Sequence, residues 1–199
     1  MIPPMKFPRS IACAPARIAW VLALVPPLLL LAGAVACSSS KVPAEFSRIA
    51  AGTRTYTSAD LESIGFKVSK RYDIAGLAGA TAATYGFWRP PVGDPIDFEF
   101  RFYGSHEEAI KYGTAPADEA TGDDAVLDVD KAAWKADVPE RRTLFRAVGS
   151  GSSGIRARYP DYVIRGNLVI LCGGATAEHA QANCSSVLSS LDALPAQGG

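Results

Sequence analysis

The sequence predicts a single α+β domain with an antiparallel sheet, helices mainly on one face of that sheet, and one disulfide bond. Two observations point to this class. Pairs of strand-like segments are each followed by a helix-like segment, and two cysteines lie where a strand and a helix can face each other. The domain is expected to span residues 46–195, about 150 residues, which is enough chain to bury a core of its own.

The domain is expected to begin with a short helix. The segment TSADLESIG offers Thr57 or Ser58 as its N-cap and Gly65 as its end. Two strands are predicted next, FKVSKRYDI over 66–74 and TAATYGFWR over 81–89, because both are rich in aromatic or β-branched residues that alternate in part. The turn-forming PPVGDP follows the second strand.

The clearest alternation in the sequence is DFEFRFY, residues 97–103. Every second residue is a phenylalanine and the residues between them are charged, which predicts a strand with two unlike faces. One face carries Phe98, Phe100 and Phe102, and the other carries Glu99 and Arg101.

A helix is predicted directly after this strand. Ser105 and Glu108 have the spacing of a capping box at the start of SHEEAIKYG. The next segment, GTAPADEATGDDAVLDVD over 113–130, is acidic and rich in turn residues, so it predicts a surface loop. A short helical piece is expected at DKAAWKA, residues 130–136.

The last predicted unit is a hairpin followed by a helix. The strands YPDYVIR (159–165) and LVILC (168–172) are joined by a tight turn with Gly166 in its first central place. LVILC is apolar on both faces, which indicates a central strand that is covered on both sides. The helix is expected to begin near Thr176.

The spacing of the cysteines in this unit allows a geometric test. If the last helix folds back over strand 168–172, Cys172 lies about 13 Å below the connecting turn at ~3.3 Å per strand residue, and Cys184 about 12 Å below it at ~1.5 Å per helix residue. A disulfide between Cys172 and Cys184 is therefore sterically reasonable, and it is the expected state if the domain folds in an oxidising compartment. The alternatives are free thiols, or a metal site that adds His179 and His106, although the short paired spacing usual in zinc sites is absent.

The N-terminus has the three parts of a secretory signal. Basic residues precede an apolar run over 18–31, and the segment closes with AGAVAC. Residues 34–37 resemble the lipobox of bacterial lipoproteins, which implies cleavage before Cys37 and acyl chains on its thiol. Such an anchor is stable when it carries more than one chain. The expected parts are a signal peptide over 1–36, a lipidated cysteine with a flexible tether over 37–45, and a tail over 196–199.

Two other interpretations of the N-terminus stay open. Residues 18–36 are 19 consecutive residues without a charge, close to the roughly 20 needed to cross a bilayer, so a retained span is one alternative and a simple secreted protein is another. Pro26 and Pro27 disfavour a span because they remove backbone donors and break a helix. The resemblance implies a domain on the extracytoplasmic side of a cell membrane, where thiols are expected to oxidise.

The charge of the chain argues against a nucleic-acid partner. The chain has 20 basic and 20 acidic residues, and 17 basic and 20 acidic residues remain without residues 1–36. Affinity for nucleic acid comes mainly from neutralised phosphates, and this mildly acidic domain shows no basic stripe.

Motifs for cofactors, metals and catalysis receive little support. GSGSSG at 149–154 fits the GxGxxG dinucleotide fingerprint, but no helix follows it, and a flexible loop is predicted. Only His106 and His179 are available as bases, and neither lies beside a nucleophile motif. The acidic segment lacks the order of an EF-hand, so a solvated loop is favoured over a weak calcium site. Its carboxylates belong to Asp118, Glu119, Asp123, Asp124, Asp128 and Asp130.

One segment, YGFWRPP, is a candidate ligand surface. It combines aromatic area with one planar cation, and its prolines can hold the end of the strand rigid. The simpler alternative is that the aromatic side chains fill the core, because burial explains them without a partner. The residues concerned are Tyr85, Phe87, Trp88 and Arg89.

The function expected from the sequence is a non-catalytic binding or interaction module at the cell envelope. It would be held at a membrane through lipid on Cys37 and would take an envelope protein or a small ligand as its partner, without a cofactor. The alternative is an envelope hydrolase that uses Asp and Glu carboxylates of the acidic segment. The missing catalytic motifs favour the binding module.

Overall fold

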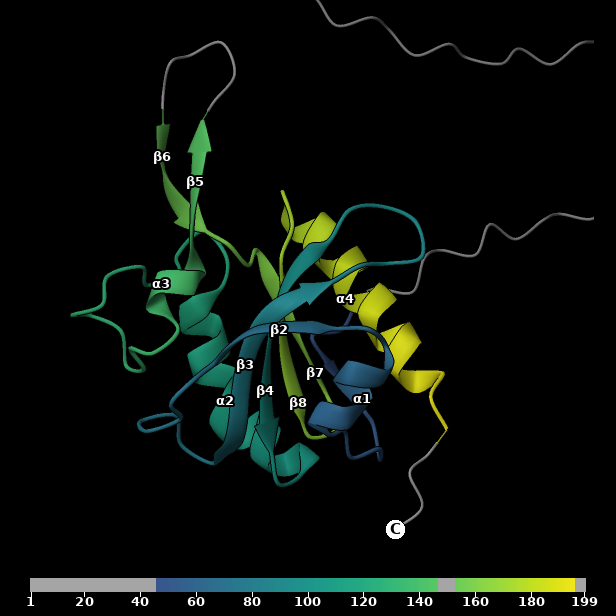
Figure 1. The fold of residues 1–199 in the computed structure, drawn as a ribbon. Helices are drawn as coiled ribbons and strands as arrows, with labels where there is room; N and C mark the ends of the chain where they lie inside the picture. The colour runs from purple at the N-terminus through teal and green to yellow at the C-terminus, as the bar shows by residue number, and fades with distance from the viewer. Residues whose placement is uncertain (1–45, 147–152, 196–199) are drawn as a thin grey trace, which may run out of the picture. The chain divides into compact units, whose positions relative to one another are not determined.

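The computed structural model describes residues 46–146 and 153–195, and the fold is drawn in Figure 1. The helices are α1 (Ser58–Ser63), α2 (His106–Ala120), α3 (Val138–Arg141) and α4 (Ala177–Asp192). The strands are β1 (Ile49–Ala50), β2 (Lys67–Arg71), β3 (Ala80–Trp88), β4 (Ile96–Tyr103), β5 (Arg142–Arg146), β6 (Ser153–Ala157), β7 (Asp161–Arg165) and β8 (Leu168–Cys172).

The strands form one large sheet and one small one. The large sheet has six strands in the order β1-β7-β8-β4-β3-β2, and β5 pairs only with β6. All neighbours in the large sheet are antiparallel except β1 and β7, which run parallel. The predicted α+β class is confirmed, and the sheet is mixed because of that one pair.

Several local predictions are confirmed by the geometry of turns and caps. The Thr57 side chain accepts a hydrogen bond from the backbone N–H of Asp60, and the Asp60 carboxylate accepts one from the N–H of Thr57. Gly65 follows α1 with φ +83°. Gly166, in the β7–β8 turn, has φ +52°, and a Cβ there would collide with the carbonyl oxygen of Arg54. A glycine is therefore required at position 166.

The large sheet buries a core on each face. Phe98, Phe100 and Phe102 pack in one core with buried residues of α1 and α4. The other core contains buried residues of α2 together with Val169 and Leu171 of β8. Helices thus lie on both faces, which differs from the expected arrangement with helices mainly on one face. The reason is the central position of β8, all of whose residues are buried, so both of its faces need a cover.

Helix α2 continues where the sequence predicted a loop. It contains Pro116 in its interior and ends at Ala120, so the loop prediction is wrong over residues 113–120. A stripe of small buried residues explains the extension, since it lets the helix approach the sheet closely. A Cβ on Gly113 would lie 2.5 Å from Cγ2 of Val169. Tertiary packing therefore overrides the local preference of proline to end a helix.

Three further details differ from the prediction. Residues 130–136 form turns, and the short helix α3 begins only at Val138. Strand β1 and the hairpin of β5 and β6 were not predicted. In the GSGSSG motif, residues 149–152 lie outside the described residues, whereas Ser153 and Gly154 begin β6 and do not form the predicted flexible loop.

One end of the large sheet brings distant parts of the chain together, and we call it the ribbon end. Here β4 and β7 begin and β3 and β8 end, as the pairs of Trp88 with Ile96 and of Asp161 with Cys172 show. The hairpin of β5 and β6 projects from this end, on the same side as the β3–β4 turn (Figure 1). The chain enters the domain there too, since Arg48 forms an ion pair with Asp161.

Within the two described ranges, no helix combines the length and the apolar character needed to cross a bilayer. Cys37 and the alternative span over 18–36 lie outside those ranges.

Candidate functional site

The hairpin of β5 and β6 exposes apolar side chains. Leu144 is 83% exposed and pairs across the hairpin with Ile155, which is 55% exposed. On the opposite face Phe145 lies over Gly154, because a Cβ on this glycine would meet the phenyl ring at 2.9 Å. Leu144 and Ile155 thus form a small exposed apolar surface on one face of the hairpin.

The outer edge of β6 has no partner strand among the described residues. The N–H of Arg158 donates to the carbonyl of Arg141 at 2.6 Å, which sets the hydrogen-bonded positions of the ladder. Hydrogen-bonded and non-hydrogen-bonded pairs alternate along antiparallel strands. Ile155 and Ala157 therefore occupy non-hydrogen-bonded positions, and their backbone N–H and C=O groups point to the open edge.

A groove of about 580 Å³ runs beside this edge, and we call it the β6 groove. Ile155, Arg156 and Ala157 line one side of it, and successive residues of a strand can share a cavity only along the strand's edge. The other side is formed by Arg48 and by residues 175–177 at the start of α4. A second cavity of about 630 Å³ also borders Ile155 and includes Val129 and Arg142.

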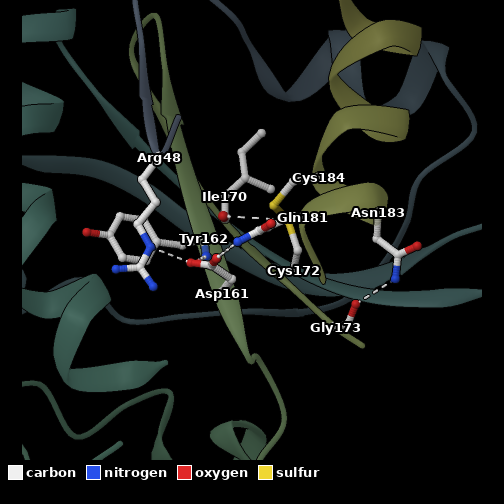
Figure 2. The surroundings of a disulfide bond; sticks show 9 residues. All are labelled: Arg48, Asp161, Tyr162, Ile170, Cys172, Gly173, Gln181, Asn183 and Cys184. Carbon is white, nitrogen blue, oxygen red and sulfur yellow. Dashed lines mark hydrogen bonds and ion pairs between the residues drawn. A yellow bond between two sulfur atoms is a disulfide. The ribbon is translucent and has the colours of Figure 1, made fainter. Parts of the chain in front are cut away.

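The walls of the β6 groove are held in place by hydrogen bonds around Asp161. This buried carboxylate accepts from Nε of Arg48 at 2.6 Å and from Nε2 of Gln181 at 2.8 Å (Figure 2). Arg156 donates from Nη1 to the carbonyl of Ala175 at 3.1 Å. Strands β1, β6 and β7 and helix α4 are thus connected around a groove that is formed before any partner binds.

The disulfide lies in the core next to these contacts. Cys172 at the end of β8 and Cys184 in α4 are bonded with a Cα–Cα distance of 5.6 Å, which confirms the predicted pair (Figure 2). Both thiols are consumed, so neither is free to bind a metal with His179. His106 contacts the carbonyl of Gly166 through Nδ1 at 2.9 Å, at the opposite end of the sheet. No cluster of three potential metal ligands occurs among residues 46–146 and 153–195.

A network of buried charges lies under the other face of the sheet, and we call it the Arg101 cluster. Arg101 donates from Nε to Glu99 at 2.7 Å and from Nη2 to Asp137 at 2.8 Å. The same Oδ2 of Asp137 accepts from Nε of Arg141 at 2.7 Å, and Arg141 reaches Glu119 at 2.9 Å. Since α3 leads directly into β5, this network fixes the root of the hairpin.

Glu99 is the carboxylate of this cluster with the least favourable surroundings. The cluster holds three carboxylates and two arginines, and Oε2 of Glu99 has no hydrogen-bond partner in the described chain. Burial, with the nearby Asp137 carboxylate adding to it, raises the pKa of Glu99 to about 7 despite the attraction of Arg101. The folded protein therefore holds a proton here at a pH where the unfolded chain has released it.

This shift predicts a pH dependence of stability. Between the unfolded pKa near 4.5 and the folded pKa near 7, the native state binds one proton more, so the free energy of unfolding falls as pH rises. The free energy of unfolding of the wild-type protein should fall by about 1.4 kcal/mol per pH unit in that range, and in Glu99→Gln this fall should be absent. Urea unfolding from pH 5 to pH 8 measures this slope. Glu62→Gln, at an exposed position of α1, is the control. A wild-type slope retained by Glu99→Gln would contradict the assignment.

The candidate surface predicted from YGFWRPP is not formed as one surface. Trp88 is buried on the α1 and α4 side, where its Nε1 donates to the carbonyl of Ile64 at 3.0 Å. Tyr85 is buried on the other side, beside the partly exposed ring of Phe87 at 5.3 Å. Arg89 is exposed in the turn that follows. Alternation along β3 separates the residues, and burial explains two of them, as the simpler alternative proposed.

The acidic segment contributes several side chains to structure. Asp118 accepts from the hydroxyl of Tyr162 at 2.8 Å, and both oxygens of Glu119 accept from the N–H of Ala133. Asp123 and Asp124 line the two cavities beside Ile155. The sequence could not reveal the role of the strand edge, because neither β6 nor its groove has a recognisable pattern. In the sequence, the one available indication was that the apolar Leu144 and Ile155 lie close to several arginines.

Fold and groove together define an α+β domain that presents an open strand edge. Residues 57–193, more than half of the chain, match the model of DUF6810, a family of unknown function, and the chain belongs to this family. Neither the curated proteins nor the solved structures give a match.

Proposed function

We propose that the protein is a lipid-anchored, extracytoplasmic binding module without catalytic activity. Its partner is an extended segment of a cell-envelope protein, which adds to the open edge of β6 and lies in the β6 groove. The observation that carries this proposal is the groove of about 580 Å³ beside an edge whose backbone groups point outward. An added strand gains affinity from main-chain hydrogen bonds and specificity from side-chain pockets.

A comparison with the β2 edge of the large sheet supports this assignment. Strand β2 also has an unpaired edge, but three of its five residues are basic, namely Lys67, Lys70 and Arg71. Charged residues on an edge discourage pairing with another chain. In β6 only Arg156 is charged, and its guanidinium is bonded to the chain before α4. The β6 edge therefore lacks the protection that β2 has.

The positions of the carboxylates support binding over hydrolysis. Glu99 and Asp137 are buried and engaged with arginines, so a substrate has no access to them. Asp118 and Glu119 hold tyrosine, arginine and backbone groups. Carboxylate pairs that hydrolyse a bond must face the bond and a water molecule. Asp118 and Glu119 are thus engaged with the domain itself, whereas Asp123 and Asp124 are exposed and border the cavities beside Ile155.

The extracytoplasmic location rests on two supports. The disulfide of Cys172 and Cys184 suits an oxidising compartment, because thiols in the cytosol are kept reduced. The lipobox resemblance of residues 34–37 supplies the anchor at Cys37. A domain closed by a disulfide and tethered by acyl chains would act at the outer face of a membrane.

The anchor is tested by the change Cys37→Ala. We expect the wild-type protein to begin at Cys37, to carry added acyl mass, and to sediment with membranes. The variant is expected to lose the acyl mass, because alanine offers no thiol. Intact-mass spectrometry with membrane fractionation measures both properties. A full-length, unmodified wild-type protein in the membrane fraction would contradict the anchor and favour the span over 18–36.

The binding edge is tested by Ile155→Pro. The N–H of Ile155 points away from β5, so proline removes a group needed by an added strand while the β5–β6 ladder keeps its bonds. We expect a photo-crosslinker at Ala157 in producing cells to give a discrete adduct with one envelope protein. The yield of this adduct should fall roughly tenfold or more in Ile155→Pro. The variant lacks one hydrogen bond to the added strand, and the proline ring clashes with that strand.

Ile155→Thr is the matched control for this experiment, since it retains the N–H and the β-branched shape. It should keep most of the adduct. Equal adduct yields in Ile155→Pro and Ile155→Thr would show that the partner does not use the edge of β6.

A further inference from the structure

The most exposed large apolar side chains of the described residues gather at the ribbon end. Val92 in the β3–β4 turn is 90% exposed and Leu144 at the hairpin is 83% exposed. Both segments extend from the same end of the sheet, the hairpin near α3 and the β3–β4 turn near α4 (Figure 1). Ile155, at 55%, borders the β6 groove, but Val92 and Leu144 line neither cavity beside it. These two side chains therefore lie outside the surface that lines the β6 groove.

Arginines accompany the two apolar side chains. Arg89 is exposed at the start of the β3–β4 turn, and Arg142 lies on the same face of the hairpin as Leu144. Asp94 is the acidic residue of that turn. Long basic side chains beside exposed apolar ones are typical of surfaces that meet a bilayer, since the stems cover apolar area and the charges reach headgroups.

The chain also enters the domain at the ribbon end. Phe46 packs on the core beside α4, and Arg48 pairs with Asp161 at the first residue of β7. Between Cys37 and Phe46 the chain can extend over no more than about 30 Å at ~3.3 to 3.6 Å per residue. An anchor at Cys37 is therefore linked to the domain through a chain that enters it at the ribbon end, which lets this end reach the membrane.

We propose that the ribbon end rests on the bilayer, with Leu144 and Val92 at the boundary of headgroups and acyl chains and with Arg89 and Arg142 on anionic headgroups. This orientation depends on the lipid anchor of the proposed function. A lipid surface fits these positions, because Val92 and Leu144 project from separate segments and neither lines the cavity that Pro95 and Thr143 border, so the two side chains match a soft, flat surface. The open edge of β6 then faces segments of proteins that lie at the membrane.

The orientation is tested on the mature, acylated protein in vesicles of phosphatidylcholine with a minor fraction of phosphatidylglycerol. Two variants carry a reporter, Leu144→Trp at the ribbon end and Glu107→Trp at the start of α2, at the other end of the sheet. Trp88 and Trp134 are each 2% exposed, so they contribute the same background fluorescence in both variants. Lipids with brominated acyl chains quench indole fluorescence only at short range.

We expect quenching of Leu144→Trp to exceed that of Glu107→Trp by roughly twofold or more, because interfacial side chains enter the boundary of the acyl chains. Adding Arg89→Glu and Arg142→Glu to Leu144→Trp should lower the quenching in anionic vesicles. Equal quenching of the two reporters would overturn the orientation, as would a reporter at 144 that is shielded from aqueous quencher without contact with brominated lipid. Quenching unchanged by the arginine replacements would overturn the role of anionic headgroups.

Intact mass is measured on the same samples. An unacylated protein would refute the anchor of the proposed function. An acylated protein with equal quenching at both ends would refute only the orientation.

Discussion

Replacing Asp137 with alanine is expected to lower the free energy of unfolding by about 3–5 kcal/mol. One oxygen of this fully buried carboxylate accepts hydrogen bonds from Arg101 at 2.8 Å and from Arg141 at 2.7 Å. Both guanidinium groups are also fully buried, so neither can turn to water when the carboxylate is removed. The loss combines the missing attraction with the cost of leaving two buried cations short of a partner.

Urea unfolding followed by tryptophan fluorescence measures this effect. Asp128→Ala is the matched control, because Asp128 pairs with Lys131 at 3.7 Å on the surface, with side chains 52% and 78% exposed. Surface pairs of this kind contribute less than about 1 kcal/mol. Asp137→Asn keeps the shape of the side chain and removes its charge. Its loss in the free energy of unfolding should lie between the losses of Asp137→Ala and Asp128→Ala. Equal losses for Asp137→Ala and Asp128→Ala would refute the structural role of the cluster.

Removing the disulfide with Cys172→Ala and Cys184→Ala together is expected to lower the free energy of unfolding by about 3 kcal/mol. The bond spans a sequence separation of 12 residues and restricts the unfolded chain. Both cysteines are fully buried in the core of α1 and α4, so the substitutions also leave a small apolar gap. The melting temperature should fall by roughly 6–12 °C.

Calorimetry with and without a reductant separates the bond from the side chains. The wild-type protein should lose stability when reductant opens the disulfide, and the double variant should be insensitive to it. A matched pair of serine-to-alanine changes on the exposed face of α4, Ser185→Ala and Ser189→Ala, should cost less than about 0.5 kcal/mol, as surface substitutions usually do. A double variant as stable as the wild type would show that the bond is dispensable for folding.

Much of the large sheet could be predicted because its local patterns agree with its packing. Phe98, Phe100 and Phe102 lie on one face as their alternation indicates, and the turn at Gly166 joins the two strands that the pattern predicted. The distance argument for Cys172 and Cys184 also succeeded, because the rises of a strand and a helix are fixed by backbone geometry.

The second face of the sheet could not be predicted in the same way. Glu99 and Arg101 look like the solvated side of a strand in the sequence, yet both are fully buried. Their surroundings come from Asp137 and Trp134, which are distant in sequence and follow a segment without periodicity. Buried ion pairs of this kind depend on long-range contacts, which no local pattern records.

The hairpin of β5 and β6 was missed for a related reason. Hydrophobic alternation reveals a strand when one face is covered by a core, and Leu144 and Ile155 are exposed instead. Strand β1 has only two residues, Ile49 and Ala50, and its parallel partner β7 begins more than a hundred residues later. The candidate site is bordered by β6 and by Arg48 directly before β1, so the site was the part least accessible to prediction.

The parallel pairing of β1 with β7 determines how the domain carries mechanical load. Tension on the chain before Phe46 acts along β1, so it shears the contacts at Ile49 and Ala50 together and does not peel them one after another. The ion pair of Arg48 with Asp161 then passes the load to Gln181 of α4 (Figure 2). That helix is covalently joined to the central strand through Cys172 and Cys184, so tension on the N-terminal part of the chain is expected to be carried to the disulfide.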